Sequence, residues 1–159
     1  MLDHTPRVAA IHDLSGLGRC SLTVALPVLS VMGCQCAPMP TAVLSSQTGG
    51  VTGYTFLDMT DQMAPIAAHW KAVDARFDAI YTGFLGSEAQ LSVVEKFFDD
   101  FAQTDTLLLV DPVMGMTARP TIPTARRSFR GCAIWPSGPI SSPPTSPRPP
   151  FCWDCPATL

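Results

Sequence analysis

An aspartate follows a strongly apolar stretch, at a position where it could take part in chemistry. Residues Leu107–Val110 predict a short buried strand, and Asp111 comes directly after them. Pro112 ends the strand, because proline has no amide hydrogen for the ladder. Ligands of open α/β sheets bind at the carboxyl ends of strands, where a carboxylate can orient a metal ion around phosphates. The alternative role for Asp111 is a helix cap or a turn.

Besides residues 111–115, which begin with Asp111, three further loop segments follow predicted strands. They are residues 13–18 (DLSGLG), 45–50 (SSQTGG) and 83–86 (GFLG). Segment 13–18 precedes a predicted helix, so its backbone N–H groups could hold a polar or anionic group. It matches neither the phosphate-binding loop ending in GK[ST] nor the dinucleotide fingerprint G-x-G-x-x-G. Taken alone, each segment could equally be an ordinary turn or polar loop.

Strands and helices alternate along the part of the chain that must position these segments. Apolar stretches predict strands at residues 7–12, 36–44, 77–82 and 107–110, and helical periodicity predicts helices at 19–32, 58–75 and 88–102. Gly33 is the expected C-cap of the first helix and Ser87 the expected N-cap of the third. The alternation predicts an α/β fold with a mostly parallel sheet and helices on both faces. Right-handed crossovers would then bring the four polar segments to one edge of the sheet.

Composition narrows the possible partners and the compartment. The net charge of −3 gives no reason to expect nucleic acid, and no apolar run is long enough to span a bilayer. The polar start, residues 1–7, has no signal-peptide pattern, so we expect a cytoplasmic protein. Cys20, Cys34 and Cys36 are expected to be free, buried thiols. Cys152 and Cys155 lack the second ligand pair or βαβ setting of a metal or redox site.

The composition changes abruptly after Gly115. Residues 1–115 carry 6 prolines and 12 acids, whereas residues 116–159 carry 10 prolines, 5 arginines and one acid, Asp154. Proline, serine and arginine at this density supply neither ladders nor an apolar face. We therefore expect residues 116–159 to be disordered, leaving Leu107–Val110 at or near an unpaired edge of the sheet.

Four segments, taken in order, are far more specific than any one of them. They read AIHDLSGLGRCSLTVALPVLSVMG, MPTAVLSSQTGGVTGYTF, FDAIYTGFLGS and LLVDPVMG. Together they strongly resemble the bacterial pyridoxal/pyridoxamine (vitamin B6) kinase family of the ribokinase-like superfamily. The resemblance covers residues 7–115, which would be the N-terminal part of a ribokinase-like kinase domain.

The resemblance implies a transferase of vitamin B6 salvage that uses ATP and Mg²⁺. Its small-molecule substrates would be pyridoxal, pyridoxine and pyridoxamine, phosphorylated on the 5′-hydroxymethyl group, and the family is often homodimeric. Asp13 looks like the polar residue that contacts the pyridine ring, and Thr48 resembles the threonine that also faces the substrate. Phe84 lies where the family often places an aromatic side chain near the ring. Asp111 resembles the acid at the ATP phosphate and magnesium site.

One motif of the superfamily does not occur in these 159 residues. Its catalytic base is an aspartate in a downstream G-x-G-D motif, and no such motif follows Gly115. No catalytic residue can therefore be assigned, and we expect a truncated, inactive product. Two alternatives stay open: a hydroxymethylpyrimidine kinase-like enzyme, because the D-x-S-G start is shared, and a non-catalytic α/β module that binds a small ligand.

A shifted reading frame would explain the foreign composition of residues 116–159. The family continues V-M-G roughly as D-D-G-K-x-Y. Codons for residues 116–124 (MTARPTIPT), read one phase back, permit D-D-G-K-T-Y-D-T-Y. The same phase over residues 141–149 (SSPPTSPRP) permits I-T-P-N-L-T-E-A, which resembles the N-x-x-E segment of the superfamily. The hypothesis is that one base was lost at the Gly115 codon.

Overall fold

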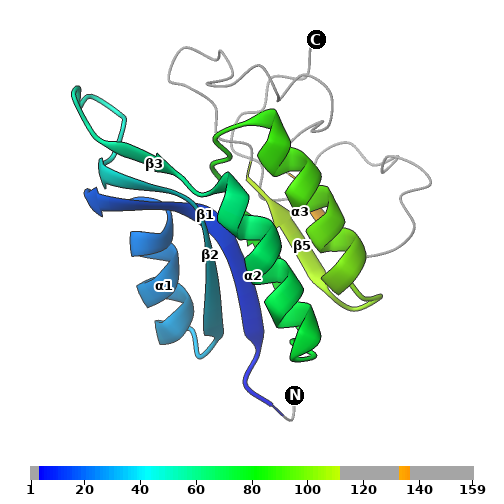
Figure 1. Ribbon diagram of the computed structural model, residues 1–159. Helices are drawn as coiled ribbons and strands as arrows, with labels where there is room; N and C mark the ends of the chain where they lie inside the picture. Colours follow the sequence, from blue (N-terminus) through cyan, green and yellow to red (C-terminus); the bar gives the residue numbers. More distant parts are fainter. Residues whose placement is uncertain (1–3, 112–132, 137–159) are drawn as a thin grey trace, which may run out of the picture.

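The computed structural model describes residues 4–111 and 133–136, and Figure 1 shows their arrangement. The elements are β1 (Arg7–Leu17), α1 (Leu22–Val31), β2 (Gln35–Ser46), β3 (Phe56–Asp58), α2 (Thr60–Ala72), β4 (Ala79–Thr82), α3 (Glu88–Phe101), β5 (Leu107–Val110) and β6 (Ala133–Pro136). Every strand and helix predicted from the sequence is present within these residues. The fold is the predicted α/β fold with a mostly parallel sheet.

The strands form one sheet in the order β3-β2-β1-β4-β5-β6. The central strands β2, β1, β4 and β5 are parallel, and the two edge strands β3 and β6 are antiparallel. The chain moves outward from β1 to β2 and then returns to the other side of β1 as β4. The carboxyl ends of β1 and β4 are therefore the topological switch point, where ligands bind in open α/β sheets.

The core lies between the sheet and the helix pair α2 and α3, which run side by side in Figure 1. Alternate residues of the strands face this pair, because successive side chains of a strand point to opposite faces. The buried cluster consists of Ala9, Ile11, Met39, Met63, Phe77, Ile80, Val94, Phe97 and Phe101. Helix α1 packs instead on β1 and β2, and buries Leu22 and Ala25 outside this cluster. The expected coverage of both faces is thus confirmed.

The strands β1 and β2 are longer than the sequence predicted. Residues 13–17 were expected to be a glycine-rich loop, but they continue β1 and pair with β2 up to Leu17 opposite Ser46. The pairing between β1 and β2 shifts register between His12 and Leu14. The loop prediction was wrong because a neighbouring strand, which local composition does not reveal, supplies the ladder partners. Figure 1 shows the ends of β1, β2 and β3 projecting together beyond the rest of the sheet.

Two prolines are accommodated in β2 by the position of its neighbours. Pro38 and Pro40 are opposite Ala10 and His12 of β1. Being two residues apart, they lack an N–H on the same side of the strand. The outer neighbour β3 pairs only with residues 42–44, so no ladder bond with β3 is lost at either proline.

Strand β5 was expected at or near an unpaired edge; it lies near the edge of the sheet but is not itself unpaired. Strand β6 pairs antiparallel with the whole of β5, from Leu107 opposite Pro136 to Val110 opposite Ala133. These four residues also depart from the disorder expected of residues 116–159. The rest of that segment lies outside the described residues, as do Cys152, Cys155 and Asp154.

The two helix caps predicted from the sequence are confirmed. Gly33 follows α1 with φ 81°, its N–H donates to the Ser30 carbonyl (3.0 Å), and the Cys34 N–H donates to the Leu29 carbonyl (2.9 Å). This pair of bonds is a Schellman motif, in which glycine is favoured because φ is positive. At α3, the Ser87 hydroxyl accepts a hydrogen bond from the Gln90 N–H at 3.4 Å.

The three cysteines expected to be free, buried thiols are free but only half-buried. They are Cys20, Cys34 and Cys36.

Candidate ligand site at the carboxyl edge of the sheet

The carboxyl ends of β1, β4 and β5 are joined directly by backbone hydrogen bonds. The Gly83 N–H donates to the Ile11 carbonyl (3.0 Å), and the Asp111 N–H donates to the Thr82 carbonyl (2.9 Å). Pairing between β1 and β4 ends at Ile11 and Thr82, so the residues that follow, His12, Gly83 and Asp111, lie side by side at this edge. Three of the four segments that were expected to converge, those containing Asp13, Gly83 and Asp111, therefore meet here, although residues 13–17 remain strand.

His12 occupies the centre of this edge, and it was not among the expected site residues. Its side chain is 3% exposed, and its ring packs edge-on against Tyr81 with the centroids 4.2 Å apart. Burial lowers the pKa of His12 to about 4, against a smaller upward effect of the Asp13 charge, so the ring is neutral at pH 7. The Nε2 atom is buried without a hydrogen-bond partner. A polar atom in this state is costly unless a ligand or water satisfies it.

Asp13 is buried beside His12 and accepts two hydroxyl hydrogen bonds. One carboxylate oxygen accepts from Ser15 Oγ at 2.7 Å, and the other accepts from Ser21 Oγ just before α1. Asp13 is 5% exposed, so its carboxylate is held in one orientation rather than swinging in solvent. A carboxylate offers about four acceptor positions, so two remain for a ligand. Residues 13–17 are strand and not the loop that was expected to hold a polar or anionic group.

The other two expected substrate residues lie at different distances from the switch point. Phe84 directly follows Gly83 and is half-buried at the edge. Thr48 is exposed and follows Ser46, whose partner Leu17 is six positions further along β1 than Ile11. The structure thus brings Asp13, Phe84 and Asp111 to one edge. It leaves Thr48 at the tip of the projecting strands.

Asp111 fits a role beside a phosphate-bound metal ion. It lies at the end of β5, and although its side chain reaches solvent, the surrounding protein raises the pKa of its carboxyl through desolvation. Among the described residues, no three His, Cys, Asp or Glu side chains form a metal cluster. Magnesium commonly uses one or two carboxylates together with substrate phosphates and water, so a single acid here suits a nucleotide-bound ion.

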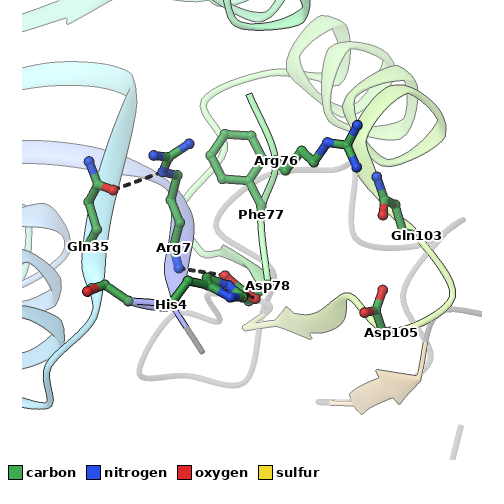
Figure 2. A pocket seen from close by; sticks show the side chains of 9 residues that line it. His4, Arg7, Gln35, Arg76, Phe77, Asp78, Gln103 and Asp105 are labelled. Atoms are coloured by element: carbon green, nitrogen blue, oxygen red, sulfur yellow. Dashed lines mark hydrogen bonds and ion pairs between the residues drawn. The ribbon is translucent and has the colours of Figure 1, made fainter. Parts of the chain in front are cut away.

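The open pocket in Figure 2 lies at the opposite, amino end of the strands and has a volume of about 580 Å³. Asp78 accepts a hydrogen bond from the Arg7 backbone N–H (2.7 Å) and pairs with His4 (2.8 Å), while Arg7 Nε donates to Gln35 Oε1 (3.0 Å). These bonds join the starts of β1, β2 and β4. We assign this pocket a structural role, since the polar groups named here satisfy one another.

Comparisons with known proteins identify structural relatives. No family model and no curated protein matches the chain. A crystal structure from Bacteroides thetaiotaomicron, provisionally described as a phosphomethylpyrimidine kinase, matches with a TM-score of 0.71 and 51% identity, over 76% of this chain and 42% of that one. A second crystal form of it, with pyridoxal, matches at 52% identity and a TM-score of 0.71, over 74% and 41%.

A pyridoxal kinase from Lactobacillus plantarum matches with a TM-score of 0.65 and 32% identity, over 70% of this chain and 40% of that one. The pyridoxal kinase of Leishmania donovani with ADP and pyridoxamine, at 20% identity and a TM-score of 0.63, shares the fold. The chain spans about two fifths of the length of these neighbours.

The strand order, the switch-point site and these neighbours define a small-molecule kinase fold. The chain has a ribokinase-like fold, and its solved neighbours include pyridoxal kinases and a protein provisionally described as a phosphomethylpyrimidine kinase. The described residues contain no helix of the length and apolarity needed to cross a membrane.

Proposed function

We propose that this chain carries the vitamin-binding part of a pyridoxal/pyridoxamine kinase. The reaction of such an enzyme transfers the γ-phosphoryl group of ATP to the 5′-hydroxymethyl group of pyridoxal, pyridoxine or pyridoxamine. The observation that carries the proposal is the 52% identity, over 74% of this chain, to a structure described as a form with pyridoxal. The 32% identity to the Lactobacillus plantarum pyridoxal kinase supports the same substrate class.

Each residue of the edge has a role that its surroundings support. The Asp13 carboxylate, fixed by Ser15 and Ser21, would accept a hydrogen bond from a ring substituent or ring N–H of the vitamin. The half-buried ring of Phe84 would stack on the pyridine ring. Thr48 lies outside this edge, and its proposed contact with the vitamin rests on the family resemblance alone.

Asp111 would hold the magnesium ion that neutralises the phosphates of ATP, which is the chemistry that the ion supplies in phosphoryl transfer. Phosphoryl transfer also needs a group that takes the proton of the attacking hydroxyl. The superfamily uses the G-x-G-D aspartate for this step, and the 159 residues contain no such motif. We therefore propose that the chain binds the vitamin without phosphorylating it.

A pyrimidine substrate is the second candidate, because the Bacteroides thetaiotaomicron neighbour is provisionally described as a phosphomethylpyrimidine kinase. Both substrates are flat nitrogen heterocycles with a hydroxymethyl group, so the same edge could accept either. A competition experiment separates them: the purified chain is saturated with pyridoxal, and hydroxymethylpyrimidine is then titrated in. The proposal predicts that pyridoxal binds and is displaced only at a large excess of the pyrimidine. Tighter binding of the pyrimidine would support the second candidate instead.

A further inference from the structure

The amide side chain of Gln90 is fully buried in the first turn of α3, with 0% of the residue exposed. Its Oε1 accepts a hydrogen bond from the Gly86 backbone N–H at 2.7 Å. Its Nε2 donates to the Thr41 carbonyl at 2.8 Å and to Thr60 Oγ1 at 2.9 Å. Burying an amide is costly unless its donors and acceptor are paired, so these partners define where the side chain lies.

The same loop is held at a second point from β2. Thr41, which is fully buried, donates through its hydroxyl to the Phe84 carbonyl at 2.8 Å. Its own carbonyl accepts from Gln90 Nε2 and from the Met59 N–H (3.1 Å), which joins the entry of α2 to the same point. The segment between β4 and α3 is therefore fixed at the Phe84 carbonyl and the Gly86 N–H.

The residue between these two points adds a third, apolar anchor. Leu85 packs against the buried cluster of the core. With the peptide groups on both sides of Leu85 hydrogen-bonded, the backbone next to Phe84 cannot rotate freely. The direction in which the Phe84 side chain leaves the backbone is consequently set by Gln90 and Thr41 together.

The carboxylate of Asp58 lies next to these hydrogen bonds and carries a negative charge. Hydrogen bonds from the Thr60 side chain and backbone lower the pKa of Asp58, so it is a carboxylate at neutral pH. Asp58 Oδ1 lies 3.4 Å from Gln90 Nε2 and accepts from Thr60. An acceptor at this point keeps the donor end of the amide turned toward Asp58 and Thr60, and leaves the oxygen end for Gly86.

We propose that Gln90 is a positioning residue that sets the placement of the Phe84 ring at the vitamin-binding edge. This inference rests on the proposed function, because it assumes that Phe84 contacts the vitamin. Gln90 itself touches no ligand. Its effect on binding passes through the backbone of residues 84–86.

A double-mutant cycle tests this proposal. Gln90→Met keeps the length of the side chain but removes all its hydrogen bonds, and Gln103→Met makes the same change at an exposed glutamine. We expect Gln90→Met to raise the dissociation constant of pyridoxal about tenfold, as the loss of one or two buried hydrogen bonds implies. In a Phe84→Ala background the same substitution should change it less than about twofold. Equal losses in the two backgrounds would overturn the proposal.

A second readout needs no ligand. Amide hydrogen exchange of Gly86 should accelerate in Gln90→Met and stay unchanged in Gln103→Met, because only the former loses the bond to the Gly86 N–H. Unchanged exchange at Gly86 would contradict the positioning role. Accelerated exchange in a chain that does not bind pyridoxal would instead reject the proposed function and leave the anchoring of the loop intact.

Thr41→Val serves as the second variant if Gln90→Met fails to fold. It preserves side-chain shape while removing the hydroxyl that donates to the Phe84 carbonyl. We expect the same dependence on Phe84 in pyridoxal binding. A weakened affinity that persists in the Phe84→Ala background would count against the shared mechanism.

Discussion

The imidazole of His12 fills the space directly beside the Cα of Gly83. A β-carbon at Gly83 would lie 2.2 Å from His12 Nδ1 and 2.4 Å from Cε1, which is closer than non-bonded atoms can approach. The contact spans the switch point between β1 and β4, where the proposed ligand site begins. Glycine is required here for close approach, and the packing of two strands depends on it.

Gly83→Ala should therefore destabilise the fold. We expect a loss of about 1–3 kcal/mol in the free energy of unfolding, since the ring must shift within a packed edge. In a His12→Ala background the substitution should cost much less, because the space is then empty. Gly49→Ala is the matched control, since a β-carbon there meets nothing within 4 Å. Denaturant unfolding of the wild type, the two single variants and the double variant measures the coupling, with Gly49→Ala as the fifth protein. An equal cost of Gly83→Ala in both backgrounds would contradict this packing.

The buried His12 ring should also make stability depend on pH in a defined window. Its pKa in the folded chain is about 4, below the ordinary value near 6.5, so the unfolded chain binds the proton more readily. The contribution of the neutral ring is complete above pH 6.5 and is lost as the pH falls from 6.5 toward 4. The loss amounts to about 3 kcal/mol at most.

Comparison with His12→Phe isolates this contribution, because the carboxylates of the fold titrate in both proteins. The difference in unfolding free energy between wild type and variant should be constant above pH 7. As the solution is acidified, the wild type should lose stability relative to the variant. A difference that stays constant down to pH 4 would show that the ring is not buried in its neutral form.

Ser21, whose hydroxyl orients Asp13, has a strained backbone. Its φ of 51° and ψ of −132° fall in a region that favours glycine. Ser21 lies just before α1, and its hydroxyl donates a hydrogen bond to Asp13. Ser21→Ala loses the hydrogen bond and keeps the strain, so we expect it to cost about 1–2 kcal/mol. Ser21→Gly loses the bond but relieves the strain, and should cost less. Thermal unfolding compares the stabilities of the two variants. If Ser21→Ala were more stable than Ser21→Gly, the strain at Ser21 would be contradicted.

The alternation of strands and helices, the parallel core and the caps at Gly33 and Ser87 could be predicted from the sequence because their signals are local. The length of β1 could not, since Ser15 and Gly16 resemble a loop and become strand only where β2 lies alongside. The three-residue strand β3 is missing from the prediction for the same reason: among the described residues it pairs with residues 42–44, and local composition does not reveal this partner.

The candidate site was predicted in part. Asp111 could be found because it directly follows a predicted strand, whereas Asp13 and Phe84 were named only through the family resemblance. His12 could not, since its position in an apolar strand gives no ligand spacing, and its importance comes from burial and from contact with Gly83. Gln90 gave no signal either, because a glutamine in the first turn of a helix is ordinary until its partners on β2 and α2 are known.

The shifted-frame hypothesis predicts one additional base at the codon of Gly115. Residues 116–132 and 137–159 lie outside the described residues, so the test is made on the gene. Resequencing across the codon should recover the base and replace residues 116–124 by the D-D-G-K-T-Y-D-T-Y continuation. An intact gene without a missing base would reject the hypothesis. The repaired chain is expected to gain soluble yield, since an acidic continuation would follow β5 in place of the Pro/Arg-rich one.

The dissociation constant of pyridoxal for the purified chain tests the central claim most directly. It should be measured by equilibrium dialysis for the wild type, for Asp13→Asn and Phe84→Ala, and for the exposed control Gln103→Met, with folding checked by circular dichroism. We predict saturable binding by the wild type and the control, and an affinity about tenfold weaker in each edge variant. Absence of saturable binding by the folded wild-type chain, or equal affinity in all four proteins, would contradict the assignment of this edge as a vitamin B6 site.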